Sequence, residues 1–72
     1  PEGLLARREE LRGRLEAYRA KAARLGRGEE PEVASRYQLA RSLLWRAPCD
    51  LPAATRAVLA YQRALVDGAP HD

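Results

Sequence analysis

The feature that most constrains the fold is a heptad stripe of apolar residues in the first third of the chain. Its members follow one another at intervals of seven, four, three, four and three residues: Leu4, Leu11, Leu15, Tyr18, Ala22 and Leu25. This spacing keeps one side of an α-helix facing a partner helix. Residues 2–25 are therefore predicted to form a long helix with one buried seam.

The positions beside the stripe carry basic side chains and no acid: Arg7, Arg12, Arg14, Arg19 and Lys21. Residues 2–27 have a net charge of +4, whereas the remainder of the chain has −1. In a parallel self-paired coiled coil these like charges would face each other along the seam, which disfavours that arrangement. An antiparallel hairpin within the chain, or a partner with acidic edges, avoids the repulsion.

Two breaks divide the rest of the chain into two further helices. Gly26 closes the first helix, and Pro31 fits the first turn of a second helix expected over residues 31–47. Pro48 ends the second helix, and Asp50 is a typical N-cap for a third helix over residues 51–67. Gly68 and Pro70 end the third helix, and residues 68–72 are expected to fray.

Both connections are short, so consecutive helices should lie antiparallel. The sequence predicts an all-α fold, a three-helix antiparallel bundle formed by residues 1–72 as a single domain. Two alternatives stay open: a helical hairpin with the third helix packed across it, and a four-helix assembly of two hairpins. The first helix exceeds the others by more than a turn, so one of its ends should project.

Length and composition limit what such a domain can do. A chain of 72 residues buries a small core, so its stability must come from helix packing or association. Cys49 is the single cysteine, which excludes an internal disulfide; we expect no metal and no cofactor. Arginine outnumbers lysine twelve to one, and Phe, Met, Ile and Asn are absent. This bias is typical of GC-rich coding, so the arginines reflect either the genome or the function.

The chain begins at Pro1 rather than at methionine, so it is expected to be either a processed chain or, as we favour, a piece of a longer protein. The source is expected to be bacterial. It shows no signal peptide and no apolar run near the ~20 residues that a membrane span needs. The expected location is cytoplasmic.

The third helix carries more apolar surface than two neighbours cover. Its centre is formed by Leu51, Ala54, Val58, Tyr61 and Leu65, and Leu59 and Val66 extend the arc to one side, Ala57 and Ala64 to the other. The helix therefore either sits centrally or meets a surface outside the chain. The second helix has a similarly wide arc: Val33, Tyr37, Leu39, Ala40, Leu43, Leu44 and Ala47.

Other conspicuous side chains allow two interpretations. Trp45 lies beside the apolar arc, as an interface anchor or as a lid over the turn at Pro48. Cys49 precedes the N-cap of the third helix, where it is either a reactive thiol or, more simply, a buried staple. The three tyrosines fall on apolar faces and are expected to cluster in the core: Tyr18, Tyr37 and Tyr61.

The spacing of Ala57, Tyr61, Ala64 and Leu65, followed by Pro70, resembles the second helix of a tetratricopeptide repeat. The resemblance covers about 17 residues, half of one repeat. Trp45 stands where that family has a small residue, and Pro48 breaks the helix where an aromatic is expected. The resemblance implies a helical adaptor module.

No pair of groups forms a catalytic constellation, so the chain is not expected to be an enzyme. The sequence favours a protein–protein interaction or docking module, with these candidate contacts: Arg7, Arg14, Lys21, Trp45, Leu59 and Val66. Three alternatives remain: nucleic-acid binding by the basic first helix, self-association, and an accessory domain of an enzyme whose chemistry lies in another chain.

Overall fold

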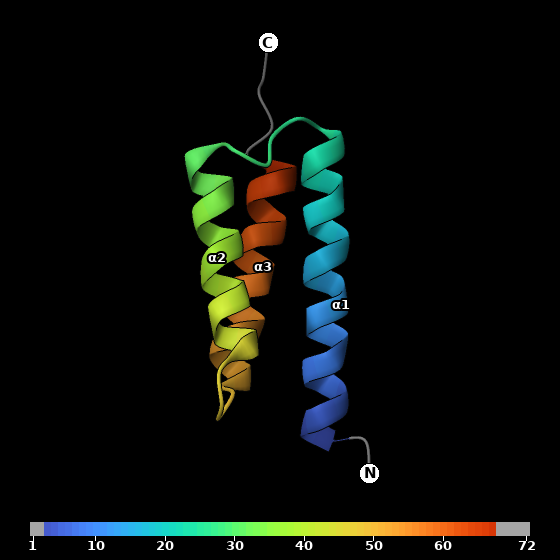
Figure 1. The fold of residues 1–72 in the computed structure, drawn as a ribbon, viewed down its shortest axis with the longest axis vertical. Helices are drawn as coiled ribbons and strands as arrows, with labels where there is room; N and C mark the ends of the chain where they lie inside the picture. The colour runs from blue at the N-terminus through green and yellow to red at the C-terminus, as the bar shows by residue number, and fades with distance from the viewer. Residues whose placement is uncertain (1–2, 68–72) are drawn as a thin grey trace.

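The computed structural model describes residues 3–67, except for the side chains of Leu4 and Asp67. It is an all-α three-helix bundle, in which α1 spans Gly3–Arg24, α2 spans Pro31–Trp45 and α3 spans Leu51–Asp67. Consecutive helices run antiparallel, so α1 and α3 are parallel to each other (Figure 1). The residues predicted to fray, 68–72, lie outside the described part of the chain.

One stripe from each helix forms the core. Its buried apolar side chains are Leu11, Leu15, Ala22, Val33, Tyr37, Ala40, Leu44, Ala54, Ala57, Val58, Tyr61 and Leu65. Helix α3 packs more extensively on α2 than on α1. Ala54 and Ala57 are buried, and these small side chains allow the close approach of α3 to its neighbours.

Three members of the apolar arcs predicted for the first two helices are exposed and lie outside this core. Leu25 follows the last residue of α1 and is 51% exposed, so the seam of α1 ends at Ala22. Ala47 is exposed because α2 ends at Trp45, two residues before the predicted end. Leu39 does not widen the buried side of α2, because it is 55% exposed.

Gly26 ends α1 through a Schellman motif. Its φ of 70° is in the left-handed region, which glycine adopts without a Cβ clash. The amide of Arg27 donates to the carbonyl of Ala22 at 2.9 Å, and the amide of Gly26 donates to Ala23 at 3.1 Å. These bonds reverse the chain and direct the Arg27 side chain back over the bundle.

The second connection is fixed by a cap and by two apolar side chains. The Ala53 amide donates to Oδ1 of Asp50 at 3.0 Å, so Asp50 caps α3 as predicted. Cys49 and Leu51 are half-buried and pack against the core. They cover the core at this end of the bundle.

The N-terminal end of α1 projects beyond α2 and α3, as its length predicts (Figure 1). Leu5 lies on this projecting turn and is 66% exposed. The first turns of α1 therefore have few neighbours within the described part of the chain.

Candidate functional site

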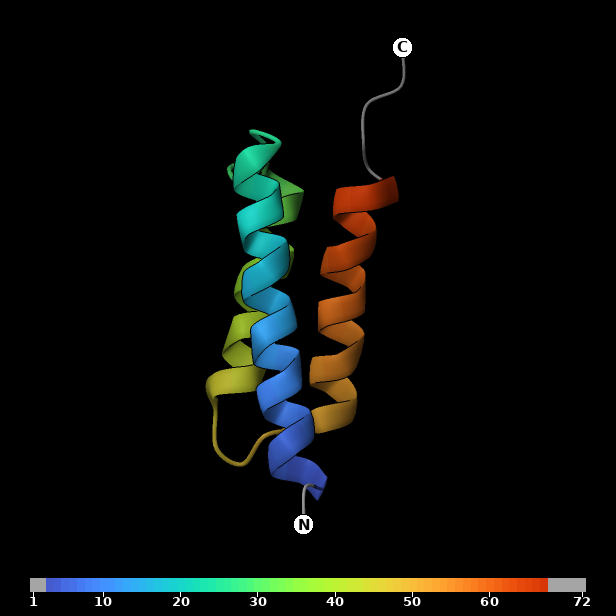
Figure 2. The same cartoon turned by 90° about the vertical axis from the view of Figure 1, so that its right-hand side faces the viewer.

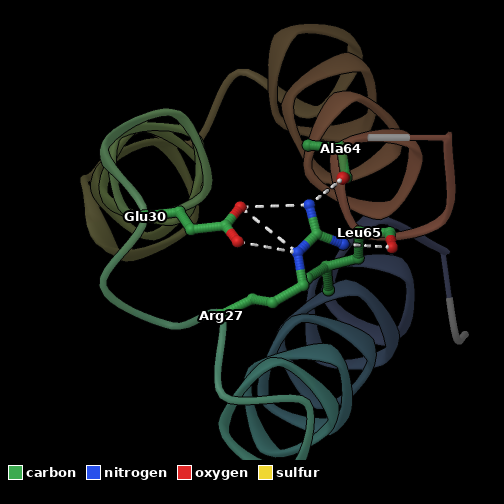
Figure 3. Close-up of polar contacts among 4 residues, drawn as sticks. All are labelled: Arg27, Glu30, Ala64 and Leu65. Carbon is green, nitrogen blue, oxygen red and sulfur yellow. Dashed lines mark hydrogen bonds and ion pairs between the residues drawn. The ribbon is translucent and has the colours of Figure 1, made fainter. Parts of the chain in front are cut away.

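Arg27 is the only charged residue in the described chain that is buried, at 8% exposure. Its guanidinium lies between the start of α2 and the end of α3 (Figure 3). Nη1 donates to the carbonyl of Leu65 at 2.7 Å, and Nη2 donates to that of Ala64 at 3.1 Å. Nε donates to the Glu30 carboxylate at 3.1 Å. These contacts satisfy carbonyls at the C-terminal end of α3, where a cation is also favoured by the helix dipole.

Arg12 has the same role at the end of α2. Its Nε and Nη2 donate to the carbonyl of Leu44 at 3.1 and 2.8 Å. Its Nη1 also pairs with Glu9 at 3.3 Å. Both arginines thus act first as helix caps, which leaves few of their donors for a ligand.

Trp45 lies against two arginines from different helices. The guanidinium carbon of Arg12 is 4.5 Å from the centre of the indole ring, and that of Arg41 is 5.2 Å away. The side chain of Trp45 remains 43% exposed. The structure therefore combines a partly accessible aromatic ring with cations that stack on it.

A second surface lies between α1 and α3, which run side by side in Figure 2. On α3, Leu59 and Val66 are seven residues apart on the exposed stripe of the helix, which also holds Arg56 and Arg63. Leu25 follows α1 at the same end of the bundle as Val66, since Arg27, two residues after Leu25, reaches the carbonyl of Leu65. We call this the α1–α3 face, defined by Leu25, Leu59 and Val66, which are 51%, 39% and 54% exposed.

The predicted basic edge lies on the same side of α1 as Leu25. Lys21 precedes Leu25 by one helical turn, and Arg14 and Arg7 continue this edge at intervals of seven residues. Its charge is partly neutralised. Glu10 pairs with Arg7 at 2.8 Å and with Arg14 at 3.4 Å. Lys21 forms no ion pair with the residues that the structure describes. Trp45 lies elsewhere, on the face between α1 and α2, so the structure divides the predicted contacts between two surfaces.

The α1–α2 side also contains a pocket of about 520 Å³, near the end of the bundle opposite to Trp45. Tyr37 and Tyr61 line it, with ring centres 5.6 Å apart, and Arg19 lies 5.1 Å over the Tyr37 ring. The Tyr37 hydroxyl donates to Glu16 at 2.9 Å. Burial is the main cause that raises the pKa of both phenols above the ordinary value, and the Glu16 contact raises the pKa of Tyr37 further.

These rings belong to the core rather than to an open site, because Tyr37 and Tyr61 are 7% and 1% exposed. Tyr18 is half-buried and packs against the same core, so the three tyrosines lie on buried faces as expected. Within residues 3–67 no group of three His, Cys, Asp or Glu side chains could hold a metal ion. None of the described helices combines the length and apolar character of a membrane span.

No family model matches the chain, and neither curated proteins nor solved structures match it significantly. The resemblance to a tetratricopeptide helix therefore depends on the quoted residues alone. Of these, Ala57, Tyr61 and Leu65 are buried in α3, whereas Pro70 lies outside the described part.

The cap roles of Arg12 and Arg27 were not predicted from the sequence. In the sequence, Arg12 flanks the heptad stripe and Arg27 follows Gly26, and neither position by itself indicates a cap. A local signal does exist for Arg27, because Glu30 lies three residues later at the start of α2. The carbonyls that both arginines bind come from residues 32 to 38 positions away, which spacing along the chain does not indicate.

Proposed function

We propose that this chain is a non-catalytic docking module that binds an amphipathic helix of another protein on its α1–α3 face. The observation that carries the proposal is the exposure of three large apolar side chains, Leu25 after the end of α1 and Leu59 and Val66 on the exposed stripe of α3. Apolar side chains gathered on one face are typical of protein contacts. The same proposal includes a cytoplasmic location and a bacterial origin.

The basic edge favours an acidic occupant. Arg7, Arg14 and Lys21 outnumber Glu10, the acid that pairs with two of them. A helix with leucines along one side and glutamates along its edges complements both the apolar centre and this charge. A second copy of the chain would instead bring the same basic edge of α1 to the interface.

A labelled peptide tests the proposal directly. The probe is an 18-residue helical peptide with leucines on one side and glutamates at both edges, compared with a peptide whose edges carry lysines. We expect the acidic peptide to bind, and Leu59→Glu to weaken binding by about tenfold or more, as for a contact worth ~1.4 kcal/mol. The measurement is fluorescence anisotropy, with circular dichroism to show that each variant is folded.

Leu39→Glu is the matched control, because Leu39 is similarly exposed (55%) but lies on α2. It should change the affinity by less than about twofold. Equal loss in both variants, or equal binding of the lysine-edged peptide, would contradict the proposal. A solution mass that doubles in the wild type and returns to a monomer in Leu59→Glu would assign the face to self-association instead.

A further inference from the structure

We propose that the cluster around Trp45 binds single-stranded nucleic acid, with a base stacked on the indole and phosphates on the surrounding arginines. The cluster consists of Arg8, Arg12, Arg41, Trp45 and Arg46, and it lies on a different face from the docking surface above. The inference therefore does not depend on that proposed function.

The arginines gather at one end of the α1–α2 side. Arg12 and Arg41 contact the indole directly. Arg46 follows Trp45 at the end of α2, and Arg8 lies one helical turn before Arg12 on the same side of α1. Among the residues that the structure describes, the one acid paired with the cluster is Glu9, which contacts Arg12. The cluster thus keeps a local excess of positive charge.

Three of these arginines have guanidinium groups that are not engaged in ion pairs within the described part of the chain. Arg8, Arg41 and Arg46 form no ion pair with the residues that the structure describes. The Nε atom of Arg8 is buried and has no hydrogen-bond partner within residues 3–67. Arg12, in contrast, uses its donors on Leu44 and Glu9. Its contribution is to hold one side of the indole, while the other three present charge to a ligand.

The indole favours nucleic acid over an acidic peptide. Carboxylates and phosphates both pair with arginine, but every nucleotide of a single strand also carries a flat base that can stack on the indole. Arg41 is exposed, so it can leave the ring for a phosphate and free a face for a base. Stacking of a base on an aromatic side chain is stronger than an exposed cation–π contact, so this exchange is favourable.

Trp45 is the only tryptophan in the chain, so its fluorescence reports on this cluster alone. Titration with a 20-nucleotide oligo-dT at low salt should quench this fluorescence. Three phosphate contacts predict that the logarithm of the affinity falls with the logarithm of salt concentration at a slope of about −2. Heparin and polyglutamate are the comparison polyanions, because they carry charge without bases.

The variant pair is Arg41→Gln with Arg46→Gln, matched by Arg56→Gln with Arg63→Gln on the outer side of α3. Both pairs remove two exposed positive charges. The first should weaken oligo-dT binding about tenfold and lower the salt slope by about 1.4, and the second less than about threefold. Trp45→Leu should weaken binding of a fluorescently labelled oligo-dT to a similar extent, measured by anisotropy.

Quenching by oligo-dT together with the larger loss in the Trp45 cluster supports the proposal. No binding at low salt, unchanged Trp45 fluorescence, or equal loss in both variant pairs overturns it. If polyglutamate binds as tightly as oligo-dT, the cluster is a surface for an acidic protein, and the proposal is wrong.

Discussion

Arg12 and Arg27 differ from the other arginines because a carbonyl at the end of another helix lies within reach of each guanidinium. Such carbonyls lack partners within their own helix, so a planar cation that binds them gains hydrogen bonds and a favourable dipole interaction together. The same residue type on α3, at Arg56 and Arg63, is exposed and forms no ion pair within residues 3–67. The role of each arginine is thus set by which helix end it can reach.

Replacement of Arg27 by glutamine should therefore destabilise the bundle. The variant loses bonds to Ala64, Leu65 and Glu30, and hydrogen bonds to charged groups contribute about 1.5–3 kcal/mol each at most. We expect the free energy of unfolding to fall by about 2–3 kcal/mol, which lowers the melting temperature by roughly 10–20 °C. Urea unfolding followed by circular dichroism measures the change.

Arg63→Gln serves as the control and should change the free energy of unfolding by less than about 0.5 kcal/mol. Equal stability of the two variants would show that the contacts in Figure 3 contribute nothing net to folding. Arg27→Lys keeps the charge but loses the planar fork, so its stability should lie between those of Arg27→Gln and the wild type.

At the scale of the helices, the glycines of α1 and of the turn that follows it differ in backbone conformation. Gly26 has a φ of 70°, whereas Gly13 and Gly28 do not have a left-handed conformation, and a Cβ at each of the three would meet nothing within 4 Å. Gly26→Ala should cost about 1–2 kcal/mol of stability. Gly13→Ala in the interior of α1 should add about 0.5–1 kcal/mol.

Gly28→Ala is the matched control for the turn, and it should leave the unfolding free energy within about 0.5 kcal/mol of the wild type. Chemical denaturation of the three variants measures these differences. A loss in Gly28→Ala as large as that in Gly26→Ala would mean that the turn tolerates no Cβ at all, rather than that it requires a left-handed residue.

The sequence predicted the elements of this fold better than its surfaces, for a physical reason. Helix starts and ends depend on local signals, such as Gly26 and Asp50, which act within a few residues. The exposure of Leu59 and Val66 also follows from periodicity, since both lie beside the buried stripe of α3. Whether Trp45 meets Arg12 depends instead on how α1 packs against α2, and no spacing within one helix contains that information.

At the scale of the whole molecule, α1 contributes to both proposed surfaces. Its side toward α3 carries Arg14 and Lys21, and its side toward α2 carries Arg8 and Arg12. This arrangement follows from the packing, because α3 lies more extensively on α2 and leaves α1 with two accessible flanks. The net charge of residues 2–27 is therefore shared by two faces rather than gathered into one basic stripe.

The buried tyrosines make the stability of the whole bundle decrease with rising pH in the alkaline range. Burial raises the pKa of Tyr37 and of Tyr61 in the folded chain, whereas both phenols titrate near pH ~10 when unfolded. Below that pH both states keep the protons, so stability is unaffected by these groups. Above it the unfolded chain loses protons that the folded chain retains, so the free energy of unfolding should decrease as pH rises.

Urea unfolding between pH 8 and about 11.5, followed by circular dichroism, measures this decrease. Tyr61→Phe keeps the buried ring and removes one ionisable group, so its stability should fall less steeply with pH than that of the wild type. All other ionisable groups are the same in both proteins, so their contributions cancel from the comparison. Parallel pH curves for Tyr61→Phe and the wild type would contradict the effect of burial, because Tyr61 is the more completely buried of the two core tyrosines.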